Sequence, residues 1–169
     1  MLVICLAVRG VGVPGASYPL LQGAPEKVDW SALIPDGDGK IEVLISCTGC
    51  HDVRLIIPQR KSRAGWSASV HNMISTYQAP LDAADVPVIL GYLERHFGES
   101  NPIDRLPINI NTAAVEVLAR LPGIDKETAN AILESRSRGP FRSAEDLTRI
   151  KGLSADTVKR IKQYITTSD

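Results

Sequence analysis

Two thiols three positions apart, followed at once by an imidazole, constrain this chain more than any other feature. Cys47 and Cys50 flank a Thr-Gly pair, and His51 comes directly after them. This spacing is typical of covalent haem attachment, because two thioethers on one helical turn hold the porphyrin edge while the adjacent ring nitrogen meets the iron. The sequence therefore predicts one haem c bound through Cys47 and Cys50, with His51 as the proximal iron ligand.

Paired thiols also occur in other kinds of site. A redox pair is typical of a βαβ setting, and the sequence shows no such unit. A zinc site needs two more ligands at close spacing, but the remaining candidates, Cys5, His71 and His96, are scattered along the chain. A structural disulfide between Cys47 and Cys50 is the simplest alternative. The histidine that follows favours haem, because a bare cysteine pair lacks it.

Length and charge leave room for two small domains. The chain has 169 residues, 44% of them apolar, and a formal net charge of zero. Residues 103–169 contain 11 Lys/Arg and 9 Asp/Glu, whereas residues 1–102 contain 8 and 10. The C-terminal part therefore has a net charge of +2, which permits a basic surface there but does not require one.

The N-terminal segment resembles an export signal. Residues 1–24 begin with an apolar run shorter than the roughly 20 residues of a membrane span, and small residues follow, although no basic stretch precedes the run. We interpret this segment as a signal peptide leading into a linker, with an apolar N-terminus of no targeting role as the alternative. The prediction is a periplasmic or other extracytoplasmic protein with no transmembrane span in the mature chain.

Apolar periodicity predicts three helices around the haem motif, over residues 40–46, 65–77 and 83–97. Met73 lies on the apolar face of the second helix, and its thioether is the predicted sixth iron ligand, which would favour the reduced iron. His71 is the main competing ligand, and an open iron position is a third option. The plain alternative for Met73 is a side chain that fills the core.

Four basic residues follow the motif: Arg54, Arg60, Lys61 and Arg63. They form either a solvated basic loop or a set in which one or two guanidinium groups approach the haem propionates, since fixed donors suit carboxylates. The sequence does not choose among them.

Taken together, residues 36–98 resemble a small mono-haem cytochrome c. The resemblance implies an all-α cytochrome fold over residues 25–100, covalent attachment at Cys47 and Cys50, and axial ligation by His51 and Met73. It also implies one-electron transfer to a redox partner protein, with no enzymatic turnover. The matching motifs are the Gly-rich entry at 36–40, the haem motif, the helix with Trp66, Val70 and Met73, the turn at 79–81, and the closing helix with Tyr92, Leu93 and Phe97.

Beyond a predicted linker over residues 101–107, the chain repeats itself. The pattern Leu-x-Arg-Leu-Pro-Gly-Ile at residues 118–124 recurs as Leu-x-Arg-Ile-Lys-Gly-Leu at residues 147–153, 29 positions later. Such self-similarity indicates two copies of one supersecondary unit. Each copy is predicted to be a helix, a tight glycine turn and a second helix, with Asp125 and Ser154 where an N-cap belongs.

Residues 108–169 resemble the tandem helix-hairpin-helix domain of the competence DNA receptor. The match is carried by residues 108–113, 121–124 and 139–147. It implies non-specific binding of double-stranded DNA, in which hairpin amides and cations meet backbone phosphates. The predicted phosphate contacts are Gly123, Lys126, Lys151, Gly152 and Lys159.

The same region is also similar to the small helix-hairpin-helix subunit on the lumenal side of photosystem II, which has a structural role. A helix-hairpin-helix module therefore also serves for docking, and Asp125 directly after the first hairpin disfavours a phosphate there. The alternative function is an electron carrier whose module docks it to a partner redox protein or membrane complex.

Overall fold

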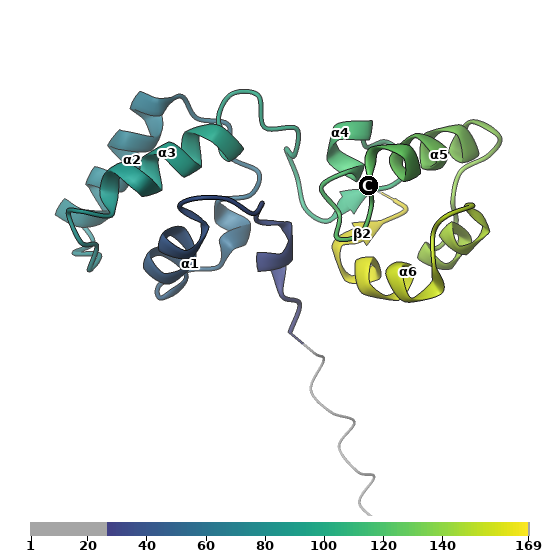
Figure 1. Ribbon diagram of the computed structural model, residues 1–169, viewed down its shortest axis with the longest axis horizontal. Helices are drawn as coiled ribbons and strands as arrows, with labels where there is room; N and C mark the ends of the chain where they lie inside the picture. The colour runs from purple at the N-terminus through teal and green to yellow at the C-terminus, as the bar shows by residue number, and fades with distance from the viewer. Residues whose placement is uncertain (1–26, 169) are drawn as a thin grey trace, which may run out of the picture.

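The computed structural model describes residues 27–168, and nearly all of their regular structure is helical. The elements form two groups that follow one another along the chain (Figure 1). The predicted export signal at residues 1–24 lies outside the described residues. Within residues 27–168, no helix has both the length and the apolar character needed to cross a bilayer.

The N-terminal group is built on α3, which packs against both α1 and α2. Its inner face buries Ile89, Tyr92, Leu93 and Phe97, which recur at helical spacing. The three helices predicted from periodicity are confirmed, with ends shifted by at most three residues. Their bounds are α1 Lys40–Thr48, α2 Arg63–Ser75 and α3 Val86–Phe97, with short 3-10 helices η1 at Trp30–Leu33 and η2 at Val53–Leu55.

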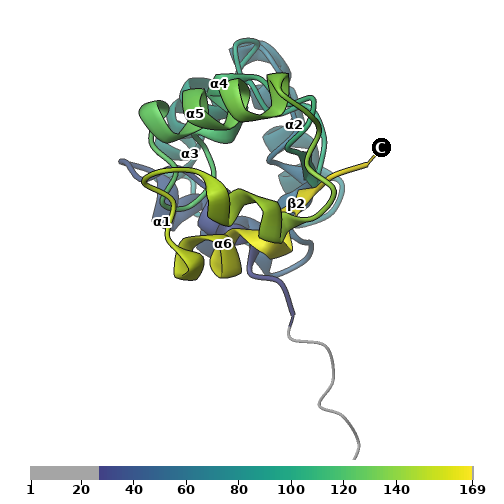
Figure 2. The same ribbon diagram turned by 90° about the vertical axis from the view of Figure 1, so that its right-hand side faces the viewer.

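The C-terminal group contains the two predicted helix–turn–helix copies. Figure 2 shows the longest helix of the first copy and the α-helix of the second on opposite sides of this group. The first helix of each copy is short, and in the second copy it is a 3-10 helix. The bounds are α4 Val115–Leu118 and α5 Lys126–Ser137, then η3 Ala144–Arg149, α6 Ala155–Ile161 and η4 Lys162–Tyr164.

The all-α prediction misses one small parallel pairing. Strand β1 (Ile108–Asn109) pairs with β2 (Ile165–Thr166), with Ile108 opposite Ile165. Each strand has two residues, so neither has an alternation that sequence can reveal. The Asn111 side-chain amide supports this closure by donating to the Phe141 and Thr167 carbonyl oxygens, both at 2.9 Å.

The two glycine turns have the backbone that the repeat predicted. Gly123 and Gly152 occupy equivalent positions with φ of +81° and +90°, a region that side chains rarely adopt. Asp125 and Ser154 cap the following helices as predicted, because their side chains accept hydrogen bonds from the backbone three residues on.

The two groups are in contact. The Tyr164 ring meets the Trp30 ring edge-on at 5.5 Å, and the Tyr164 hydroxyl donates to the Asp29 carbonyl oxygen at 2.8 Å. The Arg120 guanidinium lies 5.9 Å from the centre of the Phe97 ring. The end of the C-terminal group therefore holds the first residues of the N-terminal group.

The segment predicted as a linker is packed. Ile103 is completely buried, and Asn101 is 4% exposed. The Asn101 amide nitrogen donates to the carbonyl oxygens of Ile57 and Gln59 at 2.7 and 2.9 Å. One buried side chain thereby fixes the loop between η2 and α2.

We expect Asn101→Ala to lower the free energy of unfolding by about 2 kcal/mol, because buried carbonyl oxygens lose their donor. Urea denaturation of the full chain measures this loss. Ser100→Ala, at the exposed neighbouring position, is the control and should leave stability unchanged. Equal stability of the two variants would contradict the structural role of Asn101.

Candidate functional site

A cavity of about 540 Å³ lies within the N-terminal group, between the end of α1, η2, α2 and α3. Its volume is in the range of small-molecule and cofactor sites. The structure brings the four predicted haem-site residues, Cys47, Cys50, His51 and Met73, to its lining. Much of the remaining wall is apolar and includes Leu55, Ile56, Trp66, Val70, Ile89 and Leu93.

The two cysteines are free thiols in different settings. Cys47 is in the last turn of α1 and is half-buried, and this burial raises the pKa of its thiol. Cys50 is exposed and lies in the turn after α1, which ends at Thr48. The prediction that both lie on one helix is therefore wrong in detail, although the turn keeps both next to the same cavity.

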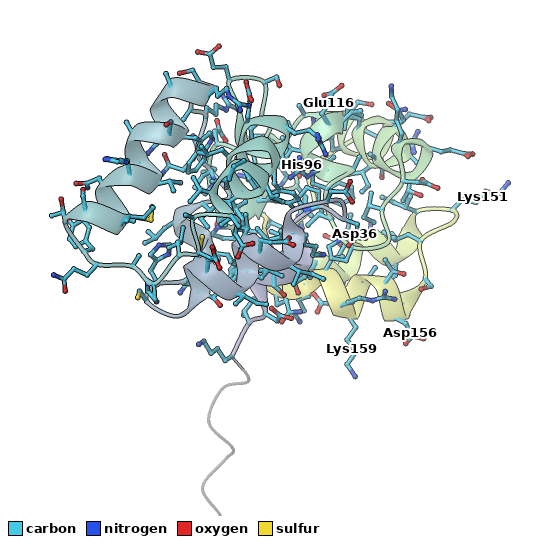
Figure 3. All side chains as sticks on the ribbon, turned by 60° about the vertical axis from the view of Figure 1, so that its left-hand side comes forward. Asp36, His96, Glu116, Lys151, Asp156 and Lys159 are labelled. Atoms are coloured by element: carbon cyan, nitrogen blue, oxygen red, sulfur yellow. The ribbon has the colours of Figure 1, made fainter. Side chains whose placement is uncertain are left out.

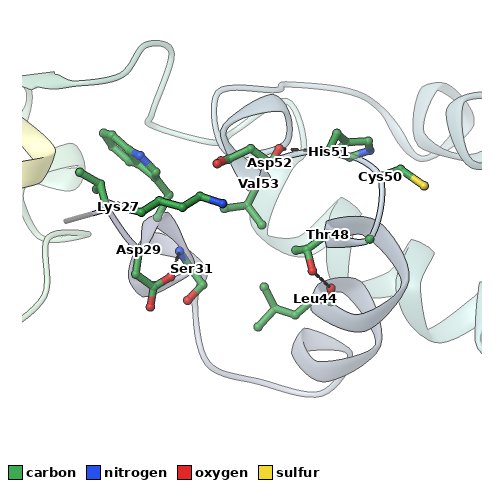
Figure 4. Close-up of a pocket in the computed structure, with 12 residues that line it drawn as sticks. Lys27, Asp29, Ser31, Leu44, Thr48, Cys50, His51, Asp52 and Val53 are labelled. Atoms are coloured by element: carbon green, nitrogen blue, oxygen red, sulfur yellow. Dashed lines mark hydrogen bonds between the residues drawn. The ribbon is translucent and has the colours of Figure 1, made fainter. Parts of the chain in front are cut away.

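One ring nitrogen of His51, the predicted proximal ligand, lies close to a backbone carbonyl oxygen. Its Nδ1 lies 3.4 Å from the Asp52 carbonyl oxygen. With the proton on Nδ1, this contact leaves Nε2 as the free acceptor, an arrangement common among metal-binding histidines. Figure 4 shows His51 and Cys50 also bordering a second cavity of about 650 Å³ on the side of Lys27 and Asp52. His51 thus stands between the two cavities.

Of the competing sixth ligands on α2, only Met73 reaches the first cavity. Met73 is half-buried and lines it. His71, two positions earlier, is exposed and is not in the lining. The angular spacing of a helix explains the difference, because residues two apart face different directions.

One of the four basic residues after the motif lines the cavity, and it is Lys61. Of the two alternatives left open by the sequence, the one with a guanidinium group at the site finds no arginine in the described lining. A loop has no regular side-chain periodicity, so the sequence could not show which of the four basic side chains turns towards the cavity. The arginines have other partners: Arg54 pairs with Asp52 at 3.1 Å, Arg63 with Glu94 at 2.6 Å, and Arg60 donates to the Pro102 carbonyl at 3.0 Å.

In the C-terminal group the two glycine turns are neighbours. A methyl group added at Gly123 would lie 3.3 Å from the Thr157 Cγ2 atom, in the first turn of α6. The Thr157 backbone N–H in turn donates to the Ser154 Oγ atom at 3.0 Å, and Ser154 is two residues after Gly152. The first turn therefore packs beside the second.

The predicted cations of this surface are exposed but diverge. Lys126, Lys151 and Lys159 are exposed, and none is in an ion pair with the residues that the structure describes. Figure 3 shows Lys151 and Lys159 projecting in different directions. Asp125 accepts from the Thr128 N–H at 2.7 Å, which holds the pKa of its carboxyl group below the usual range. A carboxylate therefore stands at the first turn, whereas the helix after the second turn is capped by the Ser154 hydroxyl group.

Comparison with known proteins identifies a family match for the C-terminal part of the chain. A match to the family described as "Helix-hairpin-helix motif" covers residues 105–166. This part of the chain is a helix-hairpin-helix module. The match lies outside the residues that line the first cavity.

Curated relatives share a short stretch with this chain. ComE operon protein 1 of Bacillus subtilis is 37% identical over 60 residues, covering 35% of this chain and 29% of that protein. The mouse and human "Endonuclease/exonuclease/phosphatase family domain-containing protein 1" are each 39% identical over 59 residues, covering 34% of this chain and 10% of those proteins. The chain thus spans less than a third of the length of these relatives.

The glycine of the second turn offers a matched test of the hairpin backbone. Neither Gly152 nor Gly91, inside α3, has any atom within 4 Å of an added methyl group. We expect Gly152→Ala to destabilise the protein by about 1 kcal/mol, because its φ is left-handed. Gly91→Ala should stabilise it by about 0.5–1 kcal/mol, since alanine favours helix. Thermal unfolding of both variants checks this, and effects of the same sign would contradict it.

Proposed function

We propose that this protein is an exported c-type cytochrome, a one-electron carrier with one covalently bound haem, whose helix-hairpin-helix module binds DNA without sequence preference. The observation that carries the first half is the shared cavity: the thiols and the imidazole of residues 47–51 and the thioether of Met73 on α2 line one largely apolar space. In c-type cytochromes the thiols attach the porphyrin, and the imidazole and the thioether ligate the iron. The proposal places the protein in the periplasm or another extracytoplasmic compartment.

Exposed apolar side chains at the edge of the cavity favour an apolar ligand in it. Leu55 is 61% exposed and Tyr77 is 73% exposed, although both border the cavity. Apolar side chains that gather around one groove are typical of ligand-binding sites. A porphyrin held at Cys47 and Cys50 would cover this side of the cavity.

Each residue has a simple task in this proposal. When bound, the haem supplies one-electron chemistry through its iron. The Cys47 and Cys50 thiols would hold it covalently, and His51 Nε2 and the Met73 sulfur would bind its iron. Ile89 and Leu93 exclude water, which keeps the local dielectric constant low and helps to set the reduction potential. No substrate is converted.

The sixth iron ligand can be identified by replacing each of the two candidates on α2, Met73 and His71, with alanine in turn. In holoprotein matured with its haem, we expect Met73→Ala to abolish the sulfur–iron charge-transfer band and lower the reduction potential, because a thioether favours ferrous iron. His71→Ala is the matched control and should leave both unchanged. A spectrum unaffected by Met73→Ala would assign the sixth position to another donor or leave it open.

The second half of the proposal rests on the neighbouring turns of the module. Backbone amides and nearby cations are the groups that position proteins on DNA phosphates. The second turn offers Gly152 and Lys151, and the helix after it is capped by the Ser154 hydroxyl rather than by a carboxylate, with Asp156 in the first turn of that helix. The competence-like sequence pattern also implies DNA binding. We therefore place the main phosphate contact at the second turn, with Gly123 and Lys126 contributing less.

Docking to a partner redox protein or membrane complex is the second candidate. It is favoured by the carboxylate of Asp125 at the first turn and by the divergent directions of Lys151 and Lys159. In this alternative the electron carrier is the same and DNA plays no part.

A mobility-shift assay of the full chain with duplex DNA separates the two candidates. We expect retardation at low salt that weakens as salt rises, with Lys151→Gln reducing the slope of log K against log salt by about 1. Lys162→Gln is the control, because that ammonium is already paired with Glu145. Absence of retardation by the unaltered protein at low salt would leave the docking function.

A further inference from the structure

Lys61 carries an uncompensated charge beside an apolar cavity. Among the described residues that line this cavity it is the one lysine or arginine, and none is an aspartate or glutamate. Lys61 is half-buried, and it has no ion pair with any residue that the structure describes. A partly buried cation without a counter-charge is unfavourable, so this position suits an anionic group of an occupant.

The ammonium is held in place before any ligand arrives. Lys61 Nζ donates to the Ser69 Oγ atom at 2.7 Å and lies 5.2 Å from the centre of the Trp66 ring. The Lys61 backbone N–H donates to the Phe97 carbonyl oxygen at 3.3 Å. An ammonium has three N–H donors, so two remain after the bond to Ser69.

The absence of a side chain at Gly65 leaves space for the Lys61 side chain. A methyl group there would lie 3.3 Å from the Lys61 Cβ atom, a tight contact. Gly65 therefore lets the Lys61 side chain turn back along α2 towards Ser69. Gln59, held by the Asn101 contact to its carbonyl, adds a neutral amide to the same lining.

We infer that Lys61 is the cationic anchor for a carboxylate of the bound cofactor, a haem propionate. This inference rests on the proposed haem site and names a further binding residue within it. The propionates are the acidic groups of haem, and a preorganised ammonium with two free N–H donors matches one of them. The same charge stabilises the reduced state of the iron, because a nearby cation favours the added electron.

The test uses full-length, matured holoprotein and compares Lys61→Gln with Lys61→Arg and Arg60→Gln. Arg60 is the control because it is the adjacent cation and does not line the cavity. The readout is the midpoint potential as a function of pH, followed by the visible spectrum. We expect Lys61→Gln to lower the reduction equilibrium constant about tenfold, which is 59 mV for one electron.

The pH profile adds a second readout. The ammonium favours the ionised carboxylate, so its removal raises the propionate pKa and moves the pH-dependent region of the potential upward. Lys61→Arg should restore both the potential and the profile, and Arg60→Gln should alter neither.

The outcomes distinguish the two proposals. If the unaltered protein holds no covalent haem, the proposed function fails, and this inference fails with it. If the unaltered protein holds haem but Lys61→Gln shows the potential and pH profile of Arg60→Gln, the Lys61 inference alone is overturned. Should Lys61→Gln fail to load haem, loading of Lys61→Arg supports the anchor, and failure of both variants overturns it.

Discussion

The carbonyl oxygen at the end of α3 fixes the position of the whole candidate site. Phe97 O accepts a hydrogen bond from the Trp66 indole at 2.9 Å and from the Lys61 backbone at 3.3 Å. The first bond holds α2 against α3, and the second holds the loop before α2. Because Trp66 is 3% exposed, this bond is formed away from water, where leaving a donor unpaired is costly. Met73 and Lys61 reach the cavity because α2 is held at this point.

The two halves of the chain are joined through a small set of contacts. Tyr164 contacts Asp29 and Trp30, the N-cap and the first residue of the 3-10 helix η1. Trp30 also lines the second cavity, which His51 and Cys50 border. Through Tyr164, the helix-hairpin-helix module therefore packs against a residue of the cavity that Cys50 and His51 also line. A module that binds DNA or a partner would hold the proposed electron carrier close to it.

Much of this architecture can be predicted from sequence because it depends on local signals. Apolar spacing located α1, α2 and α3, and the repeat located both glycine turns, where a positive φ requires glycine. The Cys-x-x-Cys-His spacing pointed to residues that the fold does bring to one cavity. The helix-hairpin-helix identity of residues 105–166 was likewise visible in the turn residues.

Other features depend on contacts between distant residues, which no local pattern encodes. The three arginines are engaged by acids or carbonyl oxygens, two of them more than 30 positions away, and this leaves Lys61 as the cation that lines the cavity. The burial of Asn101 depends on carbonyls of a loop 42 to 44 positions earlier. Strands β1 and β2 pair across the whole module and are too short to show alternation.

Covalent attachment of haem is the claim on which the account depends most. The most direct measurement is acid–acetone extraction of the full-length protein, produced in a host that matures c-type cytochromes, followed by an absorption spectrum of the reduced protein in alkaline pyridine. The account predicts that the pigment stays with the polypeptide and gives the spectrum of a haem bound through two thioethers. A colourless protein, or a pigment that passes into the acetone, would contradict it.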